Sequence, residues 1–413
     1  MKKHLTIISF LILAISAKAQ DFYSVGYYDV TNGTIAALYK NNERLYTAHI
    51  TGMPSKAFKV VCNSEGDVFW LVNHYNYPSN TLHHTEIRKN NQVYASTENQ
   101  SEIHISDMYC LNDTIFYTGY LLNETGIAIA TVWKGDDFAT HWVLGDGIHA
   151  SVIKDADVDK ETSIPYFCGY ITDSIQNAII WKGPQLLYKQ EPVGYRNSSC
   201  ANEISVDNGL VFTNGYYTFS YDGESYREPV IWKNDSVVFS ATELDFLGCL
   251  YAHQGDYYFT YSYPHGMYYA VYKNHSELLE IISQSGIQCI CGDSDDIYMT
   301  GNSSGQGCIW KNFEVYLQPD NSSRLYDLVV SYANTGMNEI KENGFTVYPN
   351  PATGVLFVET SQPEQTYRLT NLMGQTLLQG HITAETQQID ISNLSTGMYF
   401  ISMGEQTVKF VKQ

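Results

Sequence analysis

Trp181-Lys182-Gly183, near the middle of the chain, is one copy of a short motif in which an aromatic residue precedes Lys and then Gly or Asn. The other copies are Tyr39-Lys40-Asn41, Trp133-Lys134-Gly135, Trp232-Lys233-Asn234, Tyr272-Lys273-Asn274 and Trp310-Lys311-Asn312, with Arg88-Lys89-Asn90 as a degenerate seventh. Successive lysines of the motif are 38 to 51 residues apart. Self-similarity at such a period indicates tandem structural repeats, so the motif predicts seven of them.

Each repeat contains four short segments rich in Tyr, Phe, Val, Ile and Thr, separated by Gly, Asn and Asp. In the third repeat they are Ile103 to Cys110, Ile115 to Tyr120, Ala128 to Lys134 and Thr140 to Leu144. Such short connections permit only antiparallel neighbours, because a parallel return needs a crossover of about a dozen residues. The sequence therefore predicts four-stranded antiparallel sheets, arranged as the blades of a β-propeller.

A glycine recurs inside the second segment of several repeats, at Gly26, Gly119, Gly169 and Gly301. Glycine weakens a strand unless another group approaches its backbone closely. We expect this glycine to be the packing site of the aromatic residue that precedes Lys, so that the contact seals one blade against the next.

The first repeat lacks an innermost strand, because its second segment already begins at Phe22. Arg324 to Val330 has inner-strand composition, and no repeat follows it. Pairing the two would close the ring and remove two exposed sheet edges. The expectation is an all-β fold with a seven-bladed β-propeller over residues 20–332, in which strand 324–330 completes the first blade.

Residues 1–19 have the pattern of a secretory signal peptide. Lys2 and Lys3 precede an apolar stretch from Leu5 to Ala17, and Ala17-Lys18-Ala19 forms a small-residue cleavage site before Gln20. No later stretch is apolar for long enough to span a bilayer as a helix. We therefore expect export to the periplasm and no transmembrane segment in the mature protein.

The formal net charge of −20 lies almost entirely in the repeats. Residues 1–19 carry +3 and residues 344–413 carry −2, which leaves −21 between them. Such a surface repels phosphate backbones, so nucleic acid is excluded as a partner. The 8 cysteines fall mostly in apolar strand-like runs, which favours buried thiols over a disulfide framework, with Cys249 and either Cys289 or Cys291 as the alternative pair.

Beyond a linker expected at residues 333–343, the composition changes. Val347-Tyr348-Pro349-Asn350-Pro351 precedes short alternating segments, which include Leu372-Met373-Gly374, Thr396-Gly397-Met398-Tyr399 and a closing Lys409-Phe410-Val411-Lys412. Alternating strands with Gly turns predict a small β-sandwich over residues 344–413.

In this order the motifs resemble the type A C-terminal sorting domain of the type IX secretion system of Bacteroidota, over residues 344–413. The residues that carry the resemblance are Pro349, Asn350, Pro351, Gly374, Gly397, Tyr399, Lys409 and Lys412, whereas Gln375 stands where the family often has Arg or Lys. The resemblance implies recognition by the type IX machinery, translocation, and cleavage by its surface peptidase, commonly with transfer to an anchoring lipopolysaccharide. It thus implies a protein that is secreted or attached to the outer-membrane surface; an ordinary sandwich that binds cell-wall sugar is the alternative.

Two groups of residues could bind a metal. Asp155, Asp157 and Asp159 alternate in what we expect to be a loop of the fourth repeat, although the calcium-loop pattern fails because Lys160 occupies the position that needs glycine. A solvated hairpin is the alternative. His83 and His84, with His74 before them and His104 beyond, are expected not to bind a metal, because adjacent strand residues point to opposite faces.

The 34 tyrosines are the main compositional excess. Most belong to strand packing, but several fall in connections that a propeller places on one face. The residues expected on this face are Tyr75, Tyr77, Tyr195, Arg196, Tyr217, Tyr221, Tyr226, Tyr263 and His265. Aromatic rings on a rigid rim suit sugar or peptide ligands.

No local motif of a hydrolase, phosphate loop or zinc site occurs in the sequence. The leading hypothesis is therefore a non-enzymatic, secreted or surface-bound propeller that binds a glycan or an extracellular protein and needs no cofactor. The alternative is a glycan hydrolase or lyase with carboxylates at the mouth of the central channel, because propeller enzymes assemble their sites from several blades.

Overall fold

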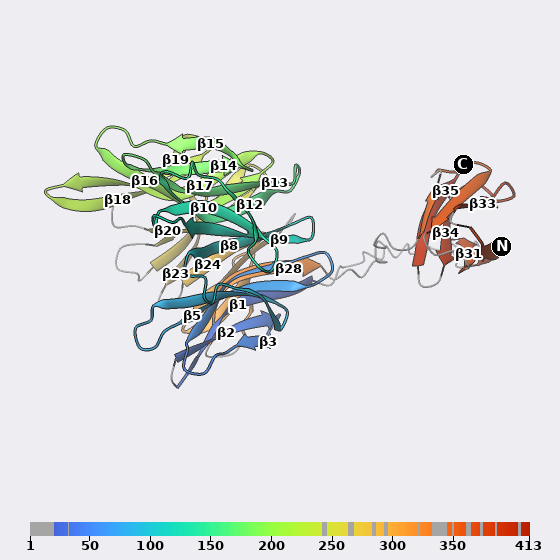
Figure 1. The fold of residues 1–413 in the computed structure, drawn as a ribbon, viewed down its shortest axis with the longest axis horizontal. Helices are drawn as coiled ribbons and strands as arrows, with labels where there is room; N and C mark the ends of the chain where they lie inside the picture. Colours follow the sequence, from blue (N-terminus) through green and yellow to red (C-terminus); the bar gives the residue numbers. More distant parts are fainter. Residues whose placement is uncertain are drawn as a thin grey trace, which may run out of the picture. The chain divides into compact units, whose positions relative to one another are not determined.

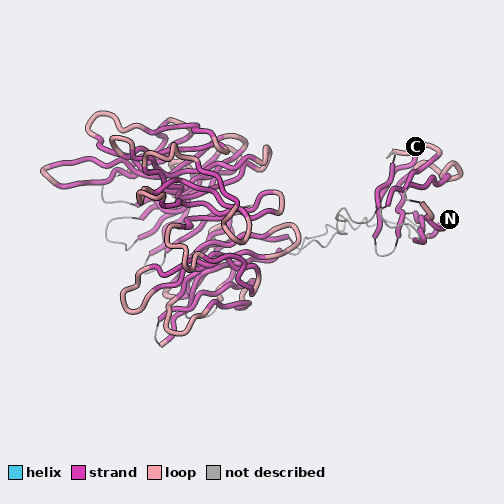
Figure 2. Tube along the Cα trace, in the orientation of Figure 1, coloured by secondary structure: helices cyan, strands magenta, loops and turns pink. Residues whose placement is uncertain are grey.

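The structure is a computed structural model of the chain. It describes residues 20–413 except 32, 242–245, 263–267, 283–285, 293–295, 320–322, 333–344, 349–350, 361–364, 372–374, 385 and 404–405. The predicted signal peptide, residues 1–19, therefore lies outside the described residues. The described chain consists of strands and turns, and it contains no helix that could span a membrane (Figure 2).

The described residues belong to two compact units. One spans Gln20–Ala333, and the other contains the strands from Phe345 to Lys412. The prediction of an all-β fold is confirmed.

The first unit contains seven four-stranded antiparallel sheets within its described residues. The first sheet combines β28 (Ser323–Tyr332), β1 (Gln20–Val30), β2 (Gly33–Lys40) and β3 (Glu43–Ala48). The second sheet contains β4 (Ser55–Cys62), β5 (Val68–Tyr75), β6 (Leu82–Lys89) and β7 (Gln92–Ser96). The third contains β8 (Ile103–Leu111), β9 (Thr114–Leu122), β10 (Ala128–Lys134) and β11 (Thr140–Val143). The fourth contains β12 (Ala150–Asp159), β13 (Ile164–Thr172), β14 (Gln176–Lys182) and β15 (Gln185–Gln190). The last three are β16 (Arg196–Asp207), β17 (Leu210–Tyr221), β18 (Glu224–Lys233) and β19 (Ser236–Ser240); β20 (Phe246–His253), β21 (Asp256–Ser262), β22 (Tyr268–Lys273) and β23 (Ser276–Ile282); and β24 (Gly286–Gly292), β25 (Ile297–Ser303), β26 (Gln306–Lys311) and β27 (Glu314–Leu317).

The recurring Lys-Asn pair sets the turn between the third and fourth strands of a blade. In the first blade Asn41 adopts a left-handed φ of 55°, a region that Asn tolerates better than most residues. Its side-chain oxygen accepts the backbone N–H of Phe22 at 3.0 Å, and Lys40 pairs with Asp21 at 2.9 Å. The same arrangement recurs at Asn90, Asn274 and Asn312 with Asp67, Asp256 and Asp296. In the blades that have Asn at this position, the motif thus ties the turn back to the start of the second strand.

Apolar side chains between neighbouring blades form seven buried clusters among the described residues, one at each blade interface. The aromatic residue of the motif lies in the cluster shared with the preceding blade; examples are Trp133, Trp181 and Trp310. The seventh cluster joins Tyr298 and Ile309 of the last blade to Tyr39 and Leu325 of the first. Each interface buries the apolar face that a single four-stranded sheet would expose, so the blades stabilise one another round a closed ring.

The ring closes through β28. This strand lies antiparallel to β1, with Phe22 opposite Val330 and Tyr28 opposite Ser323, so the two far ends of the propeller sequence share one sheet (Figure 1). Leu325 and Leu328 of β28 are buried in the cluster that joins the first and last blades.

The recurring glycine serves a different purpose from the one expected. In every blade the innermost strand shifts register against the second strand, and in the five blades whose second strand has the glycine, a carbonyl of the bulged strand crosses close to it. A Cβ added at Gly169 would lie 1.9 Å from the carbonyl oxygen of Val152, and one at Gly119 the same distance from that of His104. The aromatic residue is the near neighbour only at Gly215, where the Trp232 ring lies 2.7 Å from an added Cβ, together with a carbonyl at 2.0 Å. The packing prediction was therefore wrong, because the inner-strand backbone occupies the space.

The second unit is the predicted small β-sandwich. One sheet contains β29 (Phe345–Tyr348), β30 (Val355–Thr360) and β33 (Thr386–Asp390); the other contains β32 (Thr376–Ile382), β31 (Gln365–Asn371), β34 (Gly397–Met403) and β35 (Gln406–Lys412). Leu356, Leu369, Ile401 and Phe410 are fully buried between them.

The residues that carry the sorting-domain resemblance are distributed as follows. Tyr399 stacks on Phe410 and donates its hydroxyl to the Ser395 carbonyl at 2.7 Å, which fixes the turn before β34, where Gly397 begins the strand. Pro351 and Lys409 are exposed, while Lys412 is buried at the end of β35. Pro349, Asn350 and Gly374 lie outside the described residues.

Removal of β28 should open the ring. We compare a chain of residues 20–333 with one that ends at Leu317 and so lacks β28. The shorter chain exposes β1 as an edge and loses the burial of Leu325 and Leu328, which should destabilise it by about 3 to 6 kcal/mol and promote aggregation. Thermal unfolding of both chains measures this; equal melting temperatures and solubility would contradict the closure.

Candidate functional site

The register shift in each innermost strand directs one side chain toward the axis of the ring. In blade order from the second blade, these residues are Lys59, Asp107, Asp155, Glu203, Cys249, Cys289 and Asp327, and all of them line one cavity. Four of the seven are acidic. These seven residues are spaced along the sequence at about the repeat period, which is the pattern that could have identified them. The expectation that Asp155 lies in a loop hid this regularity.

These seven side chains form head-to-tail contacts, each with the next blade. The Asp107 carboxylate accepts the N–H of Ala156 at 3.0 Å, and the carboxylates of Asp155, Glu203 and Asp327 accept those of Ile204, Leu250 and Val60 at 2.9, 2.8 and 2.9 Å. Lys59 pairs with Asp107 at 2.9 Å. The Cys249 thiol lies 3.6 Å from the Ile287 carbonyl oxygen. Burial raises the pKa of Asp327, and the neighbouring Cys289 thiol acts in the opposite direction. We call this set of contacts the axial ring.

Lys59 provides positive charge to the axial ring. Its ammonium group lies 2.9 Å from Asp107 and 3.8 Å from Asp155. Burial by itself would lower the pKa of Lys59, but Asp107, Asp155 and Asp327 raise it well above the usual value, so the side chain stays charged. Burial, followed by repulsion from Asp107, raises the pKa of Asp155 well above its usual value.

Glu203 is an axial carboxyl that titrates near neutral pH. Burial raises its pKa to about 7, although the N–H of Leu250 and the charge of Lys59 act in the opposite direction. At pH 7 the protonated and ionised forms of this carboxyl are therefore both populated, as a general acid or base requires.

The main cavity, of about 910 Å³, lies between the C-terminal halves of the inner strands. Its walls also include Lys160, Asn208 and Gln254, which follow β12, β16 and β20 in turns to the second strand. In antiparallel blades the connections between second and third strands lie at the opposite face. The aromatic residues expected to bind a ligand are therefore not at the mouth of this cavity. A smaller cavity of about 250 Å³, also lined by Glu203, lies at the N-terminal ends of β20 and β24.

Asp155, Asp157 and Asp159 do not form a loop, contrary to expectation. All three belong to the inner strand β12. Asp155 and Asp157 accept the N–H groups of Ile204 and Val206 at 2.9 and 2.7 Å, whereas Asp159 accepts the Glu161 N–H and the Thr162 hydroxyl in its own turn. Hydrogen bonds to the neighbouring blade explain the alternation of Asp155 and Asp157, since alternate strand residues face the same side.

Most of the expected aromatic residues gather on the fifth blade. Its β17–β18 hairpin projects beyond the sheet (Figure 1) and carries Tyr221 at an Asp-Gly turn. The ring of Tyr195 contacts Phe219 edge-on at 5.4 Å, and Phe219 stacks on Tyr226 at 5.6 Å. Tyr195 and Tyr221 are 65% and 72% exposed, and the Arg196 guanidinium lies over the ring of Tyr195 at 5.8 Å from its centre.

An ion pair fixes this aromatic group. Arg196 donates from Nε and Nη2 to both oxygens of Glu228 at 2.9 and 2.7 Å, and Tyr195 donates to Glu228 at 3.2 Å. The guanidinium lies 4.1 Å from the ring centre of Tyr217. Tyr217 itself is buried and accepts the indole N–H of Trp232, so it supports the group and is not open to a ligand.

The remaining expected residues lie elsewhere. Tyr77 is 70% exposed between β5 and β6, and Tyr75 is half-buried at the end of β5 with Lys56 near its ring. These two belong to the second blade and not to the fifth. Tyr263 and His265 lie outside the described residues.

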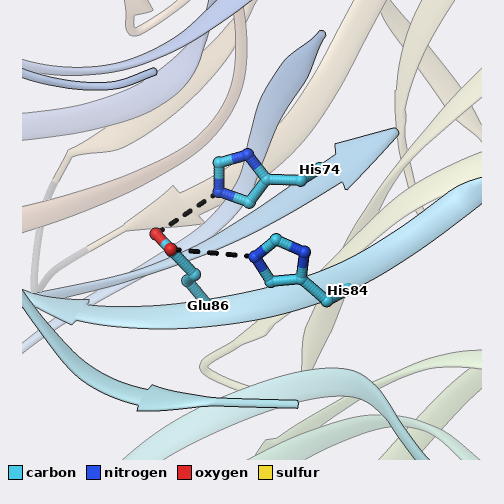
Figure 3. Close-up of side chains that lie close together, drawn as sticks. All are labelled: His74, His84 and Glu86. Carbon is cyan, nitrogen blue, oxygen red and sulfur yellow. Dashed lines mark ion pairs between the residues drawn. The ribbon is translucent and has the colours of Figure 1, made fainter. Parts of the chain in front are cut away.

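A group that sequence reasoning did not assemble lies in the second blade. His74 of β5 is directly opposite His84 of β6, and the two rings stack at 4.6 Å (Figure 3). Glu86 follows two residues after His84 and points between the rings; its oxygens lie 3.3 Å from His74 Nε2 and 3.8 Å from His84 Nε2. Arg88 Nη1 lies 2.6 Å from Glu86. The expectation considered the adjacent pair His83 and His84, whereas the hairpin register brings His74 and His84 together.

Comparison with known proteins identifies the second unit. Residues 346–413 match the family of secretion system C-terminal sorting domains, and the unit is a type IX secretion sorting domain. No curated protein matches the chain.

Solved structures resemble the chain only distantly. PorZ of Porphyromonas gingivalis, an essential bacterial surface component of the type IX secretion system, shares 9% identity at a TM-score of 0.30, over 94% of this chain and 74% of PorZ. The β-propeller domain of the Trilobed protease from Pyrococcus furiosus shares 11% at 0.39, over 73% of this chain and 92% of that domain. BamB from Moraxella catarrhalis shares 7% at 0.35, over 76% and 95% of the two chains.

Replacing Glu203 with Gln should change how stability depends on pH. Because the folded-state pKa of Glu203 is raised to about 7 from 4.5, its favourable contribution is present below pH 4.5 and is lost as the pH rises through 7. Gln can still accept the Leu250 N–H, so the variant should match the native chain near pH 4 and exceed it above pH 7.5, by on the order of 1 to 3 kcal/mol. Urea unfolding between pH 4 and 8 measures the difference. Replacing exposed Glu314 with Gln is the control, and parallel profiles for E203Q and the native chain would contradict the assignment.

Proposed function

We propose that this protein is a non-enzymatic carbohydrate-binding propeller, exported with a signal peptide at residues 1–19 and then by the type IX secretion system. The C-terminal sorting domain supports the destination, which is the cell surface or the extracellular medium. The observation that carries the binding role is the exposed aromatic group of the fifth blade.

The geometry of that group suits a sugar ligand. Tyr195 and Tyr221 present largely exposed rings, against which the C–H face of a pyranose can stack. The bidentate contact between Arg196 and Glu228 holds Tyr195 in place, so little side-chain entropy is lost on binding. Asn197 of β16, with Ser220 and Glu224 of the β17–β18 hairpin, adds polar groups that can hydrogen-bond sugar hydroxyls.

The axial carboxylates support a binding role in a second way. Asp107, Asp155, Glu203 and Asp327 each direct one oxygen to a backbone N–H of the next blade. Moving any of them toward a substrate would leave a buried N–H without a partner, which costs about 1 to 3 kcal/mol. These groups are thus explained by the fold itself.

A glycan-hydrolysing enzyme is the second candidate, and Glu203 is the observation that favours it. Its pKa of about 7 and its place between two cavities are what a general acid requires. The E203Q variant separates the two: hydrolysis of a glycan library by the native chain and not by E203Q would establish the enzyme.

Substitution of the exposed tyrosines should weaken ligand binding. On a glycan array we expect the chain of residues 20–333 to bind, and Tyr195→Ala or Tyr221→Ala to bind the same glycan at least about tenfold more weakly, because each removes a stacking face. Tyr316→Ala is the matched control, since this tyrosine is exposed on the outermost strand of the seventh blade. No binding above background, or an equal loss in the control, would end the proposal.

Deletion of residues 344–413 should trap the protein in the periplasm of its host. The sorting domain directs passage through the outer membrane, so the deleted chain loses that step while its signal peptide still acts. Cell fractionation and immunoblotting measure the location, and a reporter fused to residues 344–413 should reach the surface. Normal surface delivery of the deleted chain would refute this part of the proposal.

A further inference from the structure

We propose that His74, His84 and Glu86 bind a divalent transition-metal ion, with Zn²⁺ as the best match, between β5 and β6 of the second blade. This site is independent of the proposed carbohydrate surface. The three side chains are almost wholly buried, at 0%, 3% and 8% exposure. Their ligand atoms all lie within 4.8 Å of one another.

The strand register explains how they meet. His74 and His84 are cross-strand partners, so their side chains share one face of the sheet. Glu86 is two residues from His84 on the same strand and therefore points to the same face (Figure 3). No loop is involved, and the backbone of two paired strands fixes all three positions.

The ring nitrogens need a partner that the protein does not supply. Both nitrogens of His74 and Nε2 of His84 are buried without a hydrogen bond. His74 Nε2 approaches Glu86 at 3.3 Å, but not in hydrogen-bond geometry. A buried polar atom without a partner costs about 1 to 3 kcal/mol. A cation between Nε2 of His74, Nε2 of His84 and the Glu86 carboxylate would satisfy both Nε2 atoms and face a negative charge.

Neighbouring residues prepare the ligands. His83 Nδ1 lies 2.7 Å from His84 Nδ1. When His84 donates its Nδ1–H to His83, its Nε2 carries the free lone pair that a metal requires. Arg88 Nη1 lies 2.6 Å from Glu86 Oε2, the oxygen that also faces His74, and so fixes the carboxylate with Oε1 toward His84. Second contacts of this kind are typical of metal ligands.

The donor set selects the metal class. Two imidazoles and one carboxylate suit Zn²⁺ and related ions, whereas Ca²⁺ and Mg²⁺ prefer oxygen ligands throughout. Zn–N and Zn–O bonds of about 2.0 to 2.2 Å require the ligand atoms to close to about 3.4 Å from one another, which side-chain rotation can supply. Three protein ligands leave one position of a tetrahedron for water or another donor. His83 is exposed, so the site lies one side chain below the surface.

Metal binding to the untagged chain of residues 20–413 tests the proposal. After treatment with a chelator, the chain is titrated with Zn²⁺ by calorimetry and with Co²⁺ by visible absorption. We expect one tight site for each chain, a Co²⁺ spectrum of tetrahedral intensity, and a higher melting temperature with Zn²⁺.

Variants locate the site. His84→Gln and Glu86→Gln should each lower the Zn²⁺ affinity at least 100-fold. His83→Ala should lower it about 10- to 100-fold, because His84 then loses the hydrogen bond that keeps its proton on Nδ1. His104→Gln is the matched control, because this half-buried histidine stacks on Tyr120 in the next blade and lies outside the cluster. Circular dichroism of the metal-free proteins checks that each variant is folded.

The native chain alone can overturn the proposal whether or not a variant folds. Absence of stoichiometric Zn²⁺ binding would show that Arg88, Glu86 and the two histidines form a metal-free polar cluster. Tight binding that His84→Gln and Glu86→Gln leave unchanged would place the metal elsewhere, and would equally refute this site.

Discussion

The axial ring of side-chain contacts joins every blade to the next. In six of its contacts, a carboxylate, an ammonium or a thiol of one inner strand reaches a backbone group or an acid of the neighbouring strand. The contact between Cys289 and Asp327 completes the circuit. Because each bond lies between blades, no blade can leave the ring without breaking two of them. Buried carboxylates paired in this way strongly disfavour any arrangement that leaves a backbone N–H or an acid alone.

The axial ring depends on the bulge in each inner strand. The register shift turns one side chain toward the axis and pushes a carbonyl against the second strand, where only glycine leaves room in the blades that have it at that position. The apolar clusters lie outside this ring and contribute most of the buried area, with one large aromatic residue of the Lys-Asn or Lys-Gly motif at most interfaces. Polar contacts at the axis therefore fix the register, while hydrophobic burial supplies the stability.

The proposed binding surface is separate from this framework. The exposed rings of Tyr195 and Tyr221 do not belong to the buried clusters between the fifth blade and its neighbours. The histidine and glutamate cluster lies in the second blade, away from the axial ring, and no blade contact accounts for its unpaired nitrogens. The sorting domain is a separate unit with its own core.

The sequence by itself determined the period, the strands and the sorting domain, because these are recorded locally. The Lys-Asn turn, alternating strands such as Ile103 to Leu111, and motifs such as Thr396-Gly397-Met398-Tyr399 each depend on near neighbours in the chain. Tertiary structure alone decided which side chains meet. Asp155 looked like part of a loop because its partner, the N–H of Ile204, is 49 residues away. His74 and His84 met through the hairpin register, and the approach of the Val152 carbonyl to Gly169 through a bulge that no local pattern marks. The composition of a strand reflects the backbone preference of each residue. These contacts depend instead on strand register and ring closure, which are determined by the packing of all seven blades.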